Sequence, residues 1–482
     1  MKIHLSLVLG CVLSASLVCA ENFTQANVEK AQKIIDAAVE AYGGNDKLSA
    51  MDTIIVEHET VNVAVGQSRK PEPPWDKNDV SGITAIDYSE QVFVTRNSGS
   101  GGGFEFDNGT VINGDDSYQL NFRAGTAAQI AEPDFDTTSG PFMRVTPALL
   151  VRQVRDRAQN AYYLGEVEVD NGKYDVVGFS MAVGPAISLY FDKKSHLVTR
   201  SERVLPGFGL VEYRFNDYEQ VDGIPFNQTF ELYLNGDHNM HRKNLTTRVN
   251  APVEKLTVVD EQLVSVPAIV PDALERRQVA EGVYHIGGNG TYAMFIEMDE
   301  YVIAIGGTAG IPDRIEKLRE VVPGKPIKYG VMTHHHFDHV LGVPAYEEEG
   351  ATIITAAAHE TIVREAANDP DKVRIKAIKE RTVFEDQTRR VEIVDIGPTA
   401  HTDNILVAYL PEEGILFEAD HFAMPQAGPV PPAVSSTRTF AASLQANDLA
   451  VEKIVSAHSP RVGTMEDLRA ALAKEAVQVG KN

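Results

Sequence analysis

Cysteine is almost absent from this chain, which has 482 residues and only two cysteines, Cys11 and Cys19. Both lie within residues 1–20, where a basic start, an apolar run from Leu5 to Val18 and a small-residue end are typical of a secretory signal peptide. We expect this segment to be cleaved. The mature chain would then have no thiol, which excludes disulfides, cysteine nucleophiles and thiolate metal ligands.

The signal peptide predicts a periplasmic or secreted protein. An alternative is a lipoprotein anchored through Cys11, which follows Val8, Leu9 and Gly10. The apolar run is too short for a typical membrane-spanning anchor.

Positive charge is scarce as well. The chain has 44 lysines and arginines against 68 aspartates and glutamates, a formal net charge of -24. So acidic a surface repels phosphate backbones and argues against nucleic acid as substrate or partner. The length favours two or three domains, and 43% apolar residues suffice for a core in each.

Residues 21–264 contain no concentrated chemistry, because their histidines are scattered singly. Apolar residues at helical spacing predict a helix over Ala26–Tyr42. Beyond Met51, short alternating segments separated by Asn-Gly and Asp-Gly turns predict a mainly antiparallel β domain. We expect Ser98–Gly103 to be a flexible Ser/Gly stretch. The single tryptophan, Trp75, lies in a proline-containing loop, where it could act as a lid or contact a partner.

The hairpin rhythm of Leu189–Leu197 and Phe215–Phe226, with Tyr42-Gly43-Gly44 ahead of the first strand, resembles the curved half-barrels of periplasmic lipoprotein carriers. The resemblance implies a concave sheet that holds an apolar ligand or packs against its neighbour. It also implies a lipid or envelope contact through this domain.

A proline-containing linker over residues 265–278 separates this domain from the rest of the chain. Residues 279–482 alternate strand and helix patterns, which predicts an α/β domain.

The densest chemistry of the chain lies in one short motif, Thr333-His334-His335-His336-Phe337-Asp338-His339. Imidazole and carboxylate groups are the usual ligands of zinc-type metals. Alternate residues of an extended segment project to the same side, so His334 and His336 can converge on one ion. Asp338 and His339, at the turn that follows, can serve a second ion.

Three further candidate ligands each follow an apolar strand pattern: His401, Asp420 and His458. In this order the motifs resemble those of the metallo-β-lactamase-fold hydrolases, over about Val279 to Val479. The resemblance implies a four-layer αβ/βα sandwich with a dinuclear site at one edge, preceded here by the β domain with its amino-terminal helix. It implies a first metal held by His334, His336 and His401, a second held by Asp338, His339 and His458, and Asp420 as the bridge.

The resemblance also implies a reaction. Two divalent ions, with zinc expected, would share a bridging hydroxide, and Asp338 would orient it or accept its proton as a general base. We expect His335 to be a solvent-facing or supporting histidine that can be replaced. His421 could protonate a leaving group or be structural.

We therefore expect an exported dinuclear hydrolase whose small-molecule substrate is an ester, thioester, lactone or related amide. β-Lactam hydrolysis is an alternative, although Asp420 stands where antibiotic-degrading relatives use cysteine and the extra domain is large. A carrier of a lipophilic ligand with a non-catalytic metal site is another alternative. The seven-ligand set argues against that, because structural zinc sites are normally four-coordinate. Substrate and oligomeric state stay open.

Overall fold

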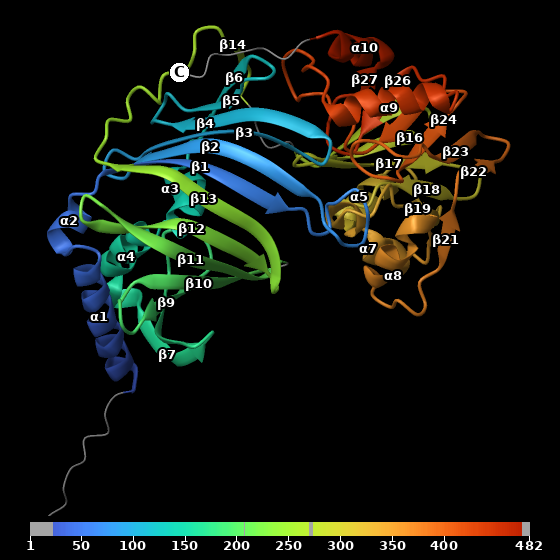
Figure 1. Ribbon diagram of the computed structural model, residues 1–482. Coiled ribbons are helices and arrows are strands. Elements are labelled where there is room, and N and C mark those ends of the chain that lie inside the picture. Colours follow the sequence, from blue (N-terminus) through green and yellow to red (C-terminus); the bar gives the residue numbers. More distant parts are fainter. Residues whose placement is uncertain (1–22, 207, 269–272, 475–482) are drawn as a thin grey trace, which may run out of the picture.

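The computed structural model describes residues 23–206, 208–268 and 273–474 (Figure 1). It is a mixed α/β structure in which a large amino-terminal sheet is followed by a sandwich of two smaller sheets. The predicted signal peptide, with Cys11 and Cys19, lies outside the described residues. Among the helices of the described ranges, none is both long and apolar enough to span a membrane.

The amino-terminal sheet has 14 strands and is antiparallel except at one edge, where β14 pairs in parallel with β6. It is curved, and Figure 1 shows it curling around the helices of this domain. In spatial order its strands are β14 (Val264–Val266), β6 (Thr126–Gln129), β5 (Tyr118–Asn121), β4 (Phe104–Ile112), β3 (Val92–Gly101), β2 (Lys77–Asp87), β1 (Thr53–Val63), β13 (Asp237–Val249), β12 (Ile224–Leu234), β11 (Gly209–Val221), β10 (Val198–Leu205), β9 (Ile187–Asp192), β8 (Gly172–Phe179) and β7 (Tyr162–Val169).

Helices cover the concave face of this sheet. Apolar residues of the helices, such as Ile35 and Leu149, share one buried core with sheet residues such as Phe93 and Phe215. Asp134 caps one helix by accepting a hydrogen bond from the backbone N–H of Thr137. The helices are α1 (Phe23–Ala41), α2 (Asn45–Ser49), α3 (Phe135–Arg144), α4 (Pro147–Asp156) and the single turn η1 (Ala158–Asn160).

The expected amino-terminal helix and antiparallel strands are therefore present, whereas α3 and α4 were not predicted. Each has only ten residues and lies in a region of strand patterns, and their stability comes from packing against the sheet. The resemblance to lipoprotein carriers stays a prediction.

The carboxy-terminal domain has four layers, helix–sheet–sheet–helix, as the predicted αβ/βα sandwich requires. Its first sheet contains, in order, β15 (Glu275–Ala280), β16 (Val283–Gly288), β17 (Thr291–Glu297), β18 (Val302–Ile305), β19 (Ile327–Val331), β20 (Thr352–Ala356) and β21 (Ile375–Ile378). Its second contains β22 (Arg381–Glu385), β23 (Arg390–Asp395), β24 (Leu406–Leu410), β25 (Ile415–Glu418), β26 (Lys453–Ser456) and β27 (Gly463–Thr464).

Three buried cores hold these layers together. The central core joins the two sheets through residues such as Ile303 and Phe417, and burial of each such side chain contributes about 1.5–3 kcal/mol. The outer cores join each sheet to its helices. The helices are α5 (Ile311–Arg319), α6 (Phe337–Val340), α7 (Val343–Glu348), η2 (Ala357–His359), α8 (Glu360–Glu365), α9 (Ser435–Ala446) and α10 (Met465–Ala473).

The predicted linker, residues 265–278, overlaps both domains. Its first two residues pair with β6 as part of β14, and Glu275 onward forms β15 of the next sheet. The chain thus crosses between the sheets over residues 267–274, of which 269–272 lie outside the described part.

Candidate metal centre

The histidine-rich motif lies where β19 ends and α6 begins. β19 is an inner strand of its sheet, paired with β18 and β20, so its carboxyl end opens at the edge of the sandwich. His334, His335 and His336 are all buried there, and α6 turns the chain so that Asp338 and His339 follow at the same edge. The buried strand thereby delivers several polar side chains to one place.

A first group of four side chains converges at this edge. Their candidate ligand atoms all lie within 4.8 Å of one another. The Nε2 atoms of His334 and His401 are 3.3 Å apart. The group consists of His334, His336, His401 and Asp420.

A second group lies beside the first and meets the same distance criterion, 4.8 Å. Nε2 of His458 is 3.1 Å from Nε2 of His339, and Oδ2 of Asp338 is 3.4 Å from Nε2 of His339. The group consists of Asp338, His339 and His458. The structure thus brings together all seven side chains that the sequence singled out as ligands.

The Asp420 carboxylate joins the two groups. Its Oδ2 lies 3.3 Å from Nε2 of His334 and 2.8 Å from Nε2 of His339, and its Oδ1 lies 3.0 Å from Nε2 of His458. Asp420 has a φ of 63°, a left-handed conformation that is uncommon outside glycine and often found at functional sites. The buried Glu418 carboxylate holds this turn by accepting from the backbone N–H groups of His421 and Phe422.

The charges of the centre follow from burial and from Asp420. Burial lowers the pKa of His336 to about 2 and that of His334 well below its usual range, so both imidazoles are neutral. Burial also acts to lower the pKa of His458, but Asp420 overcomes it and raises the value to about 9. The surrounding histidines outweigh burial at Asp420 and keep its pKa well below the usual range, so the carboxylate is ionised.

This donor set fits divalent cations. Two imidazole nitrogens about 3 Å apart cannot both present lone pairs to one another unless a proton or a cation lies between them. Oδ2 of Asp420 is buried without a hydrogen-bond donor among the described residues, close to these nitrogens. Histidine and carboxylate ligands suit zinc, iron and manganese alike.

The amino-terminal domain supplies hydrogen-bond partners to the candidate ligands. Nε2 of His336 donates to the backbone oxygen of Ser68 over 3.0 Å, and Nδ1 of His401 donates to that of Gly102 over 2.6 Å. Because a carbonyl oxygen only accepts, each ring can present its other nitrogen to a metal. Gln67 Nε2 donates to Oδ1 of Asp338 over 2.7 Å.

Two segments of that domain reach the centre, the β1–β2 loop and the β3–β4 turn (Figure 1). Arg69 in the loop forms a 2.7 Å ion pair with Asp403. At the turn, the oxygen of Gly103 accepts from Ser436 N–H over 2.7 Å. The expectation of a flexible stretch at Ser98–Gly103 is therefore wrong, because β3 continues to Gly101 and the turn is bonded to the other domain.

Sequence reasoning missed Gln67, Ser68 and Gly102 because two of them act through backbone carbonyls, which any residue type carries. Residues 21–264 therefore contribute to the centre, although their sequence shows no concentrated chemistry. The glycines of the β3–β4 turn were the sequence feature that could have indicated this contact, since Gly102 and Gly103 have positive φ angles of 57° and 83°.

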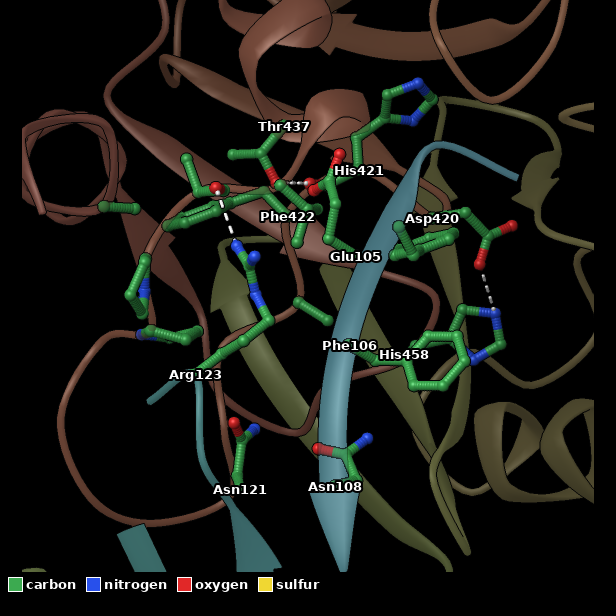
Figure 2. Close-up of a pocket in the computed structure, with 17 residues that line it drawn as sticks. Glu105, Phe106, Asn108, Asn121, Arg123, Asp420, His421, Phe422, Thr437 and His458 are labelled. Carbon is green, nitrogen blue, oxygen red and sulfur yellow. Dashed lines mark hydrogen bonds and ion pairs between the residues drawn. The ribbon is translucent and has the colours of Figure 1, made fainter. Parts of the chain in front are cut away.

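A cavity of about 390 Å³ opens beside the centre between the two domains. Figure 2 shows Asp420 facing His458 at one side of it and Arg123 reaching in from the β5–β6 turn. Phe104 and Phe106 form an apolar wall from the amino-terminal domain. Phe422, Pro431 and Pro432 line it from the carboxy-terminal domain.

The remaining histidines of the region have structural partners. His335 is buried rather than solvent-facing: its Nε2 donates to the Ser68 oxygen over 2.9 Å, and its Nδ1 lies 3.2 Å from Nε2 of His359. His421 bonds through its ring to the Ala419 oxygen over 2.6 Å and to the Thr399 hydroxyl over 3.0 Å. Burial lowers the pKa of His421 to about 4, which leaves it neutral.

Comparisons with known proteins found one matching family model, over part of this chain, and several solved structures. The model of the metallo-beta-lactamase superfamily matches residues 281–458. A solved metallo-beta-lactamase from Pontibacter korlensis is 20% identical, with a TM-score of 0.34, over 42% of this chain and 98% of its own. One from Hirschia baltica is 18% identical, with a TM-score of 0.33, over 41% of this chain and 95% of its own. The metallo-beta-lactamase FIM-1 from Pseudomonas aeruginosa, in its mono-zinc form, is 19% identical, with a TM-score of 0.31, over 42% of this chain and 94% of its own. The comparison with curated proteins gave no match.

Proposed function

We propose that this protein, whose residues 281–458 form a metallo-beta-lactamase superfamily domain, is an exported dinuclear metal-dependent hydrolase. Its substrate is a small ester, thioester, lactone or related amide, and zinc is the expected metal. Export rests on the signal-like residues 1–20.

The observation that supports this proposal most strongly is the position of Asp420. One carboxylate contacts His334 of the first ligand group and His339 of the second at 3.3 and 2.8 Å. A closed structural site would need only four ligands around one ion. Seven converging ligands with a shared carboxylate support two ions and an open coordination site.

Bound divalent cations would supply Lewis acidity, which lowers the pKa of water and polarises the carbonyl oxygen of a substrate. The side chains of the centre would bind the ions and orient one another. His334, His336 and His401 would hold one ion, and His339 and His458 with Asp338 would hold the other. The hydrogen bonds from His336 to Ser68 and from His401 to Gly102 orient those rings.

Asp338 is the general base in this proposal. It is the most exposed of the seven candidate ligands, with 39% of its side chain accessible, so it can meet a substrate-side water. Gln67 occupies Oδ1 through a hydrogen bond of 2.7 Å and fixes the carboxylate plane. Oδ2 faces the centre, 3.4 Å from Nε2 of His339, where it would contribute to the second ion's site or orient water and accept its proton.

The interdomain cavity supports a small-molecule substrate. Its volume of about 390 Å³ is in the range of small-ligand pockets. Phe104, Phe106 and Phe422 provide an apolar surface for an acyl or ring portion, and Arg123 and Glu105 provide polar contacts.

The experiment that tests the proposal is metal analysis of the purified full chain, followed by a panel of an ester, a thioester, a lactone and a β-lactam. We expect about two metal ions per chain, hydrolysis of at least one substrate, and loss and recovery of activity on chelation and zinc return. Asp420→Ala should lose bound metal and hydrolysis. Asp116→Ala, at an exposed aspartate of the other domain, is the matched control. Full metal content and activity in Asp420→Ala would overturn the assignment.

A further inference from the structure

A second cavity, of about 320 Å³, lies on the concave face of the amino-terminal sheet beside α3. None of its lining residues lines the cavity beside the metal centre. Its walls combine aromatic and aliphatic side chains with threonines, an asparagine, a histidine and an arginine. Among them are His58, Phe93, Phe142, Tyr213, Phe230 and Arg242.

Arg242 contributes an unpaired positive charge to this cavity. It lies on β13 between Thr60 of β1 and Phe230 of β12, and its guanidinium carbon is 5.7 Å from the centre of the Phe230 ring. Its Nε is buried without a hydrogen-bond partner, and it forms no ion pair within the described ranges. Burial lowers its pKa to about 10, so it still carries its charge at neutral pH. A desolvated cation without a counter-ion is costly, which favours an anion beside it.

His58 faces the same cavity from β1. It is 3% exposed, and its Nδ1 lies 3.4 Å from the Thr60 hydroxyl. Its Nε2 has no hydrogen-bond partner in the described part of the chain. Burial, reinforced by Arg242, lowers the pKa of His58 to about 3, so the ring is neutral. A neutral imidazole with one unused nitrogen can donate a hydrogen bond to an anion held by Arg242.

Two more arginines lie near the cavity-lining Tyr213. Burial, and after it the nearby Arg203, lowers the pKa of Arg144, which also bonds to Tyr213, and both arginines have an Nε without a partner among the described residues. Neither forms an ion pair with a carboxylate of the described residues. In a chain with a formal net charge of -24, three arginines without carboxylate partners concentrate positive potential on one face.

The remaining lining residues favour an apolar group in the other half of the ligand. Phe93, Phe142, Val145, Leu232 and Met240 present apolar surface to the same space. The volume lies at the lower end of small-molecule pockets, so it suits one short chain or ring rather than a bulky lipid. The purely apolar ligand implied by the sequence resemblance would leave Arg242 unpaired.

We propose that this cavity binds a small anionic amphiphile, a carboxylate on a single apolar chain, with its charged end at Arg242 and His58. The site is separate from the metal centre and does not depend on hydrolytic activity.

The test is isothermal titration calorimetry of the full chain with sodium decanoate, decyl phosphate and decan-1-ol. We expect decanoate to bind and decan-1-ol, with the same chain length and no charge, to bind at least tenfold more weakly. Arg242→Met should weaken decanoate at least tenfold and leave decan-1-ol unchanged, and Arg242→Lys should recover part of the loss. Hydrolysis by Arg242→Met should equal that of the unchanged protein.

Arg248→Met is the matched control, since Arg248 lies on the same strand but pairs with Glu57 on the outer face. It should bind decanoate as the unchanged protein does. The proposal would be overturned if decanoate did not bind, or if decan-1-ol bound as tightly as decanoate. It would also be overturned if Arg242→Met and Arg248→Met lost decanoate affinity to the same extent. Tighter binding of decyl phosphate than of decanoate would overturn the assignment of a carboxylate. Circular dichroism of each variant shows whether a loss of binding comes from unfolding. If Arg242→Met unfolds, the decanoate affinity of Arg242→Lys tests the proposal instead.

Discussion

Gln67 of the amino-terminal domain donates a 2.7 Å hydrogen bond to Oδ1 of Asp338, a candidate metal ligand 271 positions away in the sequence. Together with the Ser68 and Gly102 carbonyls, it makes the first domain part of the metal centre. Both domains therefore contribute contacts to the candidate metal centre.

Gln67→Ala should lower kcat by roughly tenfold and leave KM nearly unchanged. A hydrogen bond to a charged group contributes about 1.5–3 kcal/mol, and partial exposure of Asp338 reduces that value. Steady-state kinetics with the substrate identified in the panel measures the change. Gln32→Ala, on the exposed side of α1, is the control. An unchanged kcat in Gln67→Ala would show that this contact does not orient the base.

Gly103→Ala should weaken metal binding. A Cβ at Gly103 would lie 2.9 Å from the backbone carbon of Ala400, so the turn must move away from the His401 loop and pull the Gly102 carbonyl from Nδ1. Loss of such a supporting bond typically costs 10–100-fold in metal affinity. Competition with a chromophoric chelator measures this affinity.

Gly114→Ala is a matched control for Gly103→Ala, because Gly114 also has a positive φ, 56°, but nothing lies within 4 Å of its added Cβ. Gly114→Ala should introduce similar backbone strain and leave the metal affinity unchanged. Equal affinities in the two variants would show that the turn does not support the centre.

His335→Ala should destabilise the protein, contrary to the expectation that this residue is replaceable. The substitution removes hydrogen bonds to Ser68 and His359 in a buried site, which costs about 1–3 kcal/mol. Thermal unfolding of the metal-free protein measures the effect, and His196→Ala is the exposed control. An unchanged melting temperature would restore the original expectation.

Metal affinity should rise between pH 6 and pH 9. In the metal-free protein Asp420 raises the pKa of His458 to about 9 against the effect of burial, so below that pH a metal must displace a proton from this ring. Deprotonation of His458 therefore raises the metal affinity by up to about tenfold for each unit of pH, and this increase ends above pH 9. Chelator competition at several pH values checks the slope. An affinity that is constant from pH 7 to pH 9 would contradict the prediction.

The sequence was most informative where chemistry is carried by side chains on buried strands. His334, His401, Asp420 and His458 each follow an apolar segment, and strand ends in a sandwich meet at one edge. The strand pattern of the first domain was equally readable, because alternation and Asn-Gly turns are local signals. The helices α3 and α4 were not, since packing on a distant sheet stabilises them.

What the sequence determined by itself was an α/β carboxy-terminal domain and the set of seven candidate ligands, because both rest on residue type and short spacing. The αβ/βα sandwich was implied by the family resemblance. Only the tertiary structure decided that the β1–β2 loop and the β3–β4 turn complete the centre, and that Arg242 and His58 share one cavity. Backbone carbonyls leave no mark in a sequence, and an unpaired charge is recognisable only once every neighbour in space is known. The physical reason is that hydrogen bonding and desolvation depend on contacts between segments hundreds of residues apart.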